Sequence, residues 1–249
     1  MGTERSKFDL SVPNGYNKGR INSKRSLRWP AAPVITLPAC PTHIVQRGNN
    51  RSLCFYETAD QRHYLELLAK ISVRYGVAVH AYCLMSNHVH ILVTCGHVDS
   101  ISWMMRVVGS SYAQYINKKN ERTGTLWEGR HRSSMIQSTH HLLNCYRYIE
   151  LNPVRANMVN HPANYRWSSY AVNAKGESSW LTEHDEYTAL GNSKAGRLAA
   201  YRQLFNTPLD EHEIEFFRAS CRSCTPVGDK DFIASWGRHA RTGDGEIKK

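Results

Sequence analysis

The sequence contains no long apolar segment. No run in its 249 residues approaches the ~20 consecutive apolar residues that are needed to cross a bilayer. The N-terminus also lacks the apolar core of a signal peptide. These absences exclude membrane-spanning, collagen-like and secreted-miniprotein classes. Hydrophobic residues at 41% and charged residues at 21% are ordinary globular values, so the length predicts one or two globular domains.

Acidic residues are scarce relative to basic ones. Aspartate and glutamate number 21 against 32 lysines and arginines, which gives a formal net charge of +11. Such an excess favours a polyanionic partner, nucleic acid above all, over a basic protein without such a partner.

The seven cysteines are odd in number and scattered, which favours reduced thiols in a cytoplasm over a disulfide framework. Cys221-Arg-Ser-Cys224 has the spacing of half a zinc site, but no second Cys-x-x-Cys pair completes it.

The distribution of apolar and turn-forming residues divides the chain into three parts. Residues 1–37 read as a basic, disordered N-terminal arm, 38–172 as the main domain and 173–249 as a helical C-terminal extension. The extension is expected to hold helices near 193–206 and 211–217 and to become loose and polar from Pro226.

Within 38–172, periodicity predicts the order β-α-β-β-α-β-α. The expected elements are a strand at 43–46, a helix at 59–75 with a Thr58-x-x-Gln61 capping box, strands at 77–85 and 88–95, a helix after Asp99, a strand within 127–137 and a helix at 139–151. The first six elements match an α+β, ferredoxin-like (βαββαβ) antiparallel sheet with helices on one face.

A histidine pair lies in the second of the paired strands. Side chains alternate along a strand, so His88 and His90 project from one face and Val89 from the other. Two neutral imidazoles so placed can chelate one divalent metal. A chance His-x-His among thirteen histidines is the alternative.

The last helix of the main domain carries a tyrosine that its apolar stripe does not need. At ~100° per residue, Tyr148 shares a face with His141, Asn144, Cys145 and Asn152, whereas Leu142, Leu143, Tyr146 and Ile149 lie opposite and account for packing. A phenol, with a pKa of ~10, becomes a workable nucleophile when a metal polarises a phosphate for in-line attack. The alternative is an ordinary surface tyrosine.

Four ordered motifs carry a family resemblance. They are Arg47-Gly48-Asn49-Asn50-Arg51, the segment Ala81 to His90 (AYCLMSNHVH), Gly124 to Arg130 (GTLWEGR) and Tyr148 to Ala156 (YIELNPVRA). Together they resemble the single-tyrosine HUH transposases of insertion-sequence type, and most closely the REP-associated tyrosine transposases. The resemblance spans about 38–172 and independently implies a ferredoxin-like fold.

The resemblance also implies an activity. Tyr148 would attack a phosphodiester of single-stranded, hairpin-flanked DNA and form a 5′-phosphotyrosine link. His88 and His90 would hold Mg²⁺ or Mn²⁺, with Asn152 at the position of the third ligand. Such an enzyme would act in the bacterial cytoplasm in association with the nucleoid, without a membrane partner. Relatives include monomers and homodimers, so the oligomeric state stays open.

Candidate DNA contacts flank these groups. They are Arg47, Asn49, Asn50, Arg51, Arg130, Arg132 and Arg155. Guanidinium groups suit phosphates and guanine edges, and amides suit adenine. A solvated basic face is the alternative.

Two other functions remain compatible with the sequence. One is a domesticated relative that binds hairpin DNA without cleaving it. The other is a metal hydrolase in which the histidines activate water, with Glu150 nearby as a base.

Overall fold

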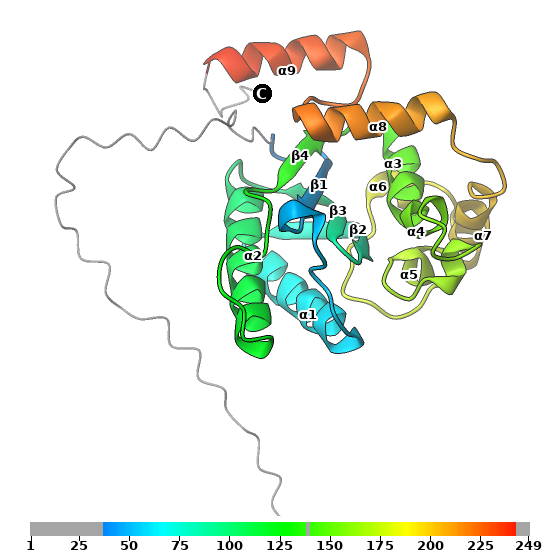
Figure 1. The fold of residues 1–249 in the computed structure, drawn as a ribbon. Helices are drawn as coiled ribbons and strands as arrows, with labels where there is room; N and C mark the ends of the chain where they lie inside the picture. Colours follow the sequence, from blue (N-terminus) through cyan, green and yellow to red (C-terminus); the bar gives the residue numbers. More distant parts are fainter. Residues whose placement is uncertain (1–36, 138–139, 243–249) are drawn as a thin grey trace, which may run out of the picture. The chain divides into compact units, whose positions relative to one another are not determined.

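A four-stranded antiparallel sheet forms the centre of the protein (Figure 1). The computed structural model describes residues 37–137 and 140–242, so nearly all of the expected N-terminal arm lies outside the described residues. The strands lie in the order β2-β3-β1-β4. Their bounds are Thr42–Arg47 (β1), Val77–Met85 (β2), His88–Cys95 (β3) and Arg132–Met135 (β4).

Two long helices cover one face of this sheet. They are α1 (Thr58–Arg74) and α2 (Ser100–Lys119), and a short 3-10 turn, η1 (Asn49–Arg51), follows β1. Their apolar faces share a core with the strands. This strand order, with a helix in each crossover, is the ferredoxin-like arrangement. The predicted α+β fold class is therefore confirmed.

The opposite face carries a layer of shorter helices around a second core. They are α3 (His140–Glu150), α4 (Asn152–Arg155), η2 (Pro162–Asn164), α5 (Tyr170–Lys175), α6 (Asp185–Thr188), α7 (Lys194–Gln203) and α8 (Glu211–Ser223), followed by α9 (Lys230–Thr242). Figure 1 shows α3 to α7 grouped on one side and α8 running across the end of the sheet near β4. Within the described ranges, no helix has the length and apolar character to cross a bilayer.

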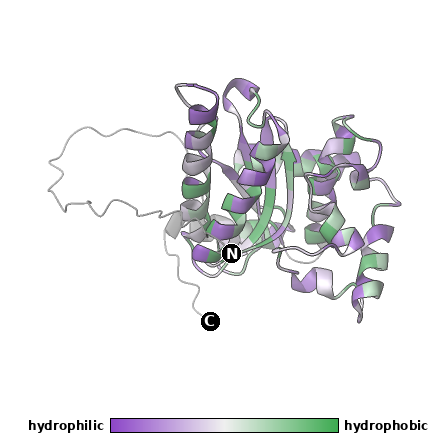
Figure 2. Ribbon diagram, turned by 90° about the horizontal axis from the view of Figure 1, so that it is seen from below, coloured by the Kyte–Doolittle hydropathy of each residue, from purple (hydrophilic) through white to green (hydrophobic). Residues whose placement is uncertain are grey.

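Strand β3 separates the two cores. Val89, Ile91 and Val93 are buried against α1 and α2, whereas Leu92 belongs to the core on the α3 side. The period of two then places His88 and His90 on the α3 side as well. In Figure 2 hydrophobic colour follows the strands between the helical layers.

The start of α1 differs from the predicted capping box. Glu57 is the N-cap, and Glu57 and Asp60 satisfy each other's backbone N–H groups in place of Thr58 and Gln61. Asp60 prevails because it is buried and also accepts a hydrogen bond from the Tyr115 hydroxyl (3.1 Å) and pairs with Lys119.

The segment after Pro226 was predicted to be loose, which is wrong because α9 occupies it. The Asp229 carboxylate accepts from the backbone N–H of Phe232 (2.8 Å) and from Gln137 Nε2 (2.7 Å). The cap of this helix therefore depends on Gln137, which lies 92 residues earlier.

Glu150, at the end of α3, is fully buried within the helical layer. Its carboxylate accepts hydrogen bonds from Ser169 Oγ (2.6 Å), Asn173 Nδ2 (2.9 Å) and the Tyr201 hydroxyl (2.8 Å). It therefore joins α3 to α5 and α7. Burial raises the pKa of this carboxyl from 4.5 to about 7, although the three hydrogen bonds oppose the rise.

The raised pKa of Glu150 predicts how stability varies with pH. The folded protein holds this proton to higher pH than the unfolded chain, so stability falls as pH rises from 4.5 to about 7. Glu150→Gln removes the charge that burial disfavours. We expect the variant to gain on the order of 3 kcal/mol relative to wild type as the pH of urea denaturation rises through this window. The exposed Glu66→Gln is the control, and stability curves of Glu150→Gln and wild type that stay parallel would contradict the prediction.

Candidate functional site

A cavity of about 660 Å³ lies on the α3 side of the sheet. Strands β1 and β3, helices α3, α4 and α8 and the loop before β4 supply its lining. The lining residues are Val45, Arg47, Arg51, Asn87, His88, His90, Glu128, Arg130, Arg132, Tyr148, Asn152, Arg218, Cys221 and Arg222. The cavity thus brings together the predicted nucleophile, the three predicted metal ligands and four of the seven candidate DNA contacts.

The two histidines are neighbours with one ring nitrogen each already bonded. Their ring centroids lie 5.0 Å apart. His88 Nδ1 lies 2.6 Å from Asn87 Oδ1, and His90 Nδ1 lies 2.9 Å from His43 Nε2. Burial lowers the pKa of His88 to about 4 and that of His90 well below 6.5, and neighbouring Arg47 adds to both effects. Both imidazoles are therefore neutral near pH 7, as metal ligation requires.

Tyr148 lies edge-on to the histidines from the opposite wall. Its ring centroid is 5.9 Å from that of His90 and 5.7 Å from that of His43. Its hydroxyl makes no hydrogen bond within the part of the chain that the structure describes. Burial raises its pKa to about 12, so the phenol is neutral near pH 7.

The tyrosine face of α3 is buried, so the alternative of an ordinary surface tyrosine is wrong. Tyr148 is 5% exposed, and Cys145 on the same face is fully buried. Helix α8 covers this side, with Phe217 packed against Tyr148 at 5.1 Å between centroids. The single-helix pattern could not show this because the covering helix lies some 70 residues further along the chain.

Asn152 begins α4, one turn after Tyr148. Its Nδ2 donates to the carbonyl oxygens of Tyr148 (3.0 Å) and Ile149 (3.2 Å). The amide nitrogen is thus held by the end of α3, which leaves Oδ1 as the acceptor that Asn152 can offer to the cavity.

These donors fit a divalent cation. Two neutral imidazoles and one amide oxygen are a mixed nitrogen and oxygen set, which suits Mn²⁺ and is compatible with Mg²⁺ that keeps several waters. Within residues 37–137 and 140–242, no group of three His, Cys, Asp or Glu side chains forms a metal cluster. Of the Cys221 and Cys224 pair, only Cys221 lines the cavity.

Arginine dominates the charge of the cavity lining. The lining contains one carboxylate, that of Glu128, and six guanidinium groups. These belong to Arg47, Arg51, Arg130, Arg132, Arg218 and Arg222. Arg218 lies 3.8 Å from Glu215, which also pairs with Arg222. The cavity is therefore suited to a polyanion.

Three of the candidate DNA contacts do not line this cavity. Asn49 and Asn50 lie in η1 beside it. The Arg155 guanidinium stacks on the Tyr148 ring at 4.3 Å from the centroid and donates to the Tyr148 carbonyl at 2.8 Å. Arg155 therefore stabilises the position of Tyr148 near the end of α3.

Several residues of the site were not predicted from the sequence. His43 lies under His90, and Arg218, Cys221 and Arg222 come from α8. The spacing of Ile214, Phe217 and Cys221 at i, i+3 and i+7 could have shown that the helix predicted at 211–217 continues to Cys221.

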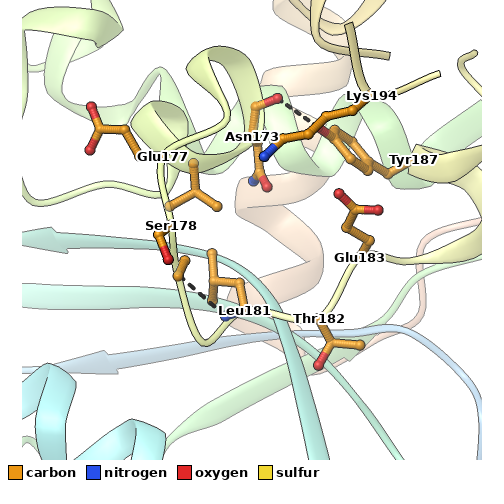
Figure 3. A pocket seen from close by; sticks show the side chains of 10 residues that line it. Asn173, Glu177, Ser178, Leu181, Thr182, Glu183, Tyr187 and Lys194 are labelled. Carbon is orange, nitrogen blue, oxygen red and sulfur yellow. Dashed lines mark hydrogen bonds between the residues drawn. The ribbon is translucent and has the colours of Figure 1, made fainter. Parts of the chain in front are cut away.

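A second, smaller cavity of about 260 Å³ lies between α5, the following loop and α7 (Figure 3). Asn173, Glu177, Glu183, Tyr187 and Lys194 are among its lining residues, and Tyr187 donates to the Asn173 carbonyl at 2.8 Å. None of the predicted site residues lines it.

The part of the chain that supplies most of the large cavity matches a known family. Residues 36–152 match the family described as "Transposase IS200 like". The range contains both histidines, Tyr148 and Asn152. This part of the chain is therefore similar to the IS200-like transposases. The family resemblance carried by the four motifs is thereby confirmed.

Two solved structures are similar to this chain. A REP-associated tyrosine transposase bound to a REP hairpin has 17% identity and a TM-score of 0.50, over 60% of this chain and 88% of the other. At this identity the match supports the fold alone. A candidate transposase from Deinococcus radiodurans R1 has 17% identity and a TM-score of 0.32, over 57% and 92%; so low a score supports no conclusion. No curated protein matches the chain significantly.

The packing of Tyr148 predicts how two substitutions affect stability. Tyr148→Phe removes a hydroxyl without a hydrogen bond and keeps the ring contacts, so we expect a change in unfolding free energy within about 0.5 kcal/mol. Phe217→Ala opens a void beside that ring and should cost roughly 3–5 kcal/mol. Urea denaturation measures both. A large loss in Tyr148→Phe would mean that the hydroxyl has a structural partner.

Proposed function

We propose that the protein cleaves and rejoins single-stranded DNA through a covalent bond to Tyr148, with a divalent metal held by His88, His90 and Asn152. One observation carries this proposal: a tyrosine without a structural hydrogen bond faces two neutral imidazoles inside an arginine-lined cavity. One chain supplies all of these groups, so the reaction can proceed within a monomer.

Cleavage follows from the position of the phenol. The Tyr148 hydroxyl oxygen bonds to the phosphorus of a phosphodiester, and the bond from phosphorus to the 3′ oxygen breaks. The phenol proton passes to water in the cavity, and the leaving 3′ oxygen takes up a proton from water. The products are a free 3′-hydroxyl and a 5′-phosphotyrosine. Attack by another 3′-hydroxyl reverses the step and joins strands, so no external energy source is needed.

The remaining groups prepare this step. A bound divalent metal supplies charge neutralisation at the scissile phosphate. His88, His90 and Asn152 would hold it, while the arginines of the lining bind the neighbouring phosphates. Arg155 keeps its positive charge against the Tyr148 ring and helps to counter the effect of burial on the phenol.

Hairpin-flanked DNA is the substrate class that we propose. The similar REP-associated tyrosine transposase was solved with a REP hairpin. The net charge of +11 and the arginine lining of this chain suit the same kind of ligand.

The alternatives make different demands on the cavity. A hairpin-binding protein that does not cleave would use the same arginines but would not need a tyrosine that faces the histidine pair. A metal hydrolase needs a carboxylate base, but Glu150 is buried under α5 and α7, outside the lining, which leaves Glu128.

The proposal predicts a covalent adduct. Wild-type protein incubated with a labelled hairpin-flanked oligonucleotide and Mn²⁺ should give a shifted band on a denaturing gel, and Tyr148→Phe should give none. Because the ring is retained, the variant should still bind the hairpin. Tyr146→Phe, on the opposite and fully buried side of α3, is the matched control and should keep the adduct.

The outcomes of the adduct experiment distinguish the proposed function from its two alternatives. An adduct that persists in Tyr148→Phe would move the nucleophile to another residue. Binding by wild type without an adduct would support the non-cleaving alternative, and cleavage without an adduct would support a hydrolase.

The arginines of α8 predict a salt-dependent contact with DNA. Arg218→Ala and Arg222→Ala should each weaken hairpin binding and lower the slope of log affinity against log salt concentration by about one. Fluorescence anisotropy over a salt series measures both quantities. Arg62→Ala, on α1 at the other face of the sheet, is the control. Slopes that match wild type would show that α8 does not contact phosphates.

A further inference from the structure

Three buried side chains connect the C-terminal helix to the histidine pair. His90 Nδ1 lies 2.9 Å from His43 Nε2, and His43 Nδ1 lies 3.0 Å from Cys221 Sγ. The two imidazoles are stacked, with ring planes 14° apart. His43 is fully buried, His90 is 5% exposed and Cys221 is 8% exposed. These groups therefore form a continuous hydrogen-bonded chain from β3 through β1 to α8.

A neutral imidazole carries one N–H. The donors and acceptors in this series of hydrogen bonds can therefore be arranged in only two directions. In the first, His90 Nδ1–H donates to His43 Nε2, and His43 Nδ1–H donates to Cys221 Sγ. In the second, the Cys221 thiol donates to His43 Nδ1, and His43 Nε2–H donates to His90 Nδ1. The second direction puts the proton of His90 on Nε2.

Only the first direction leaves His90 able to bind a metal. His90 Nδ1 is occupied by His43, so Nε2 is the nitrogen that remains for the cavity. A nitrogen that bears a proton has no lone pair for a cation, so ligation requires the proton of His90 on Nδ1.

We propose that Cys221 and His43 are positioning residues that hold His90 in its metal-binding tautomer, so that α8 belongs functionally to the active site. The role of this tautomer rests on the proposed function. The sulfur of Cys221 accepts the N–H of His43, and His43 then accepts the N–H of His90. Neither residue touches the DNA or the reacting atoms in this assignment.

A hydrogen-bond acceptor at position 221 stabilises the tautomer of His43 that carries its proton on Nδ1. Without it, the Nδ1–H of His43 would be buried with no partner, which is unfavourable. The pair of imidazoles avoids this loss by reversing direction, which places the proton of His90 on Nε2 and blocks ligation. A serine at 221 preserves an acceptor, whereas a valine preserves the volume without one.

The experiment compares Cys221→Val with Cys221→Ser in the full-length protein. Two-bond ¹H–¹⁵N spectra of the imidazole rings, recorded without metal and assigned with His43→Ala and His90→Ala, report the tautomers. Electron paramagnetic resonance measures Mn²⁺ affinity. Wild type and Cys221→Ser should carry the His90 proton on Nδ1, and Cys221→Val should carry it on Nε2 and bind Mn²⁺ roughly tenfold more weakly. Cys54→Ala, a buried cysteine in the other core, should behave as wild type.

The results separate this inference from the proposed function. A wild-type His90 with its proton on Nε2 overturns the inference even if neither Cys221 variant folds. So does a Cys221→Val protein with wild-type tautomers and Mn²⁺ affinity, although adduct formation would then stand. Conversely, a wild type that forms no adduct and binds no Mn²⁺ overturns the proposed function. The tautomer change in metal-free Cys221→Val would still support the positioning of His90 by His43 and Cys221.

Discussion

The burial of α3 between the sheet and α8 is the constraint on which the site depends. The sheet supplies the histidines on one side of Tyr148, and Phe217 closes the other side. Arg155 and Asn152 both bond to the carbonyl of Tyr148, so the end of α3 is fixed relative to α4. The phenol therefore faces the imidazoles without a movement of the helix, and this arrangement needs Phe217, which lies well beyond the residues that match the family.

The same burial sets the charge state of the site. It lowers the pKa values of the histidines and raises that of Tyr148, so the ligands and the nucleophile are all neutral near pH 7. The positive charge comes from arginines around them. A neutral, buried centre inside a basic rim is a favourable place for a phosphate and a divalent cation, because burial strengthens electrostatic attraction.

Local patterns in the sequence predicted much of the fold. Strands β2 and β3 have the predicted bounds because their alternation and the Ser86-Asn87 turn are local signals. Contacts between distant residues were not predictable in this way. The cap of α9 requires Gln137, and His43 meets a cysteine 178 positions later. The predicted catalytic and ligand residues lie in one cavity, whereas the packing of α8 against the tyrosine face of α3 could not be predicted because it joins residues far apart in the sequence.

The C-terminal extension therefore changes the environment of the site as well as its size. Cys221 bonds to His43 and Phe217 packs on Tyr148, while Arg218 and Arg222 line the cavity from the same helix. Because these four side chains share one rigid element, displacement of α8 would alter the ligand geometry, the nucleophile and the basic lining together. A chain that ended soon after α4 would need other means to bury Tyr148 and to fix His43. In this protein α8 performs both tasks.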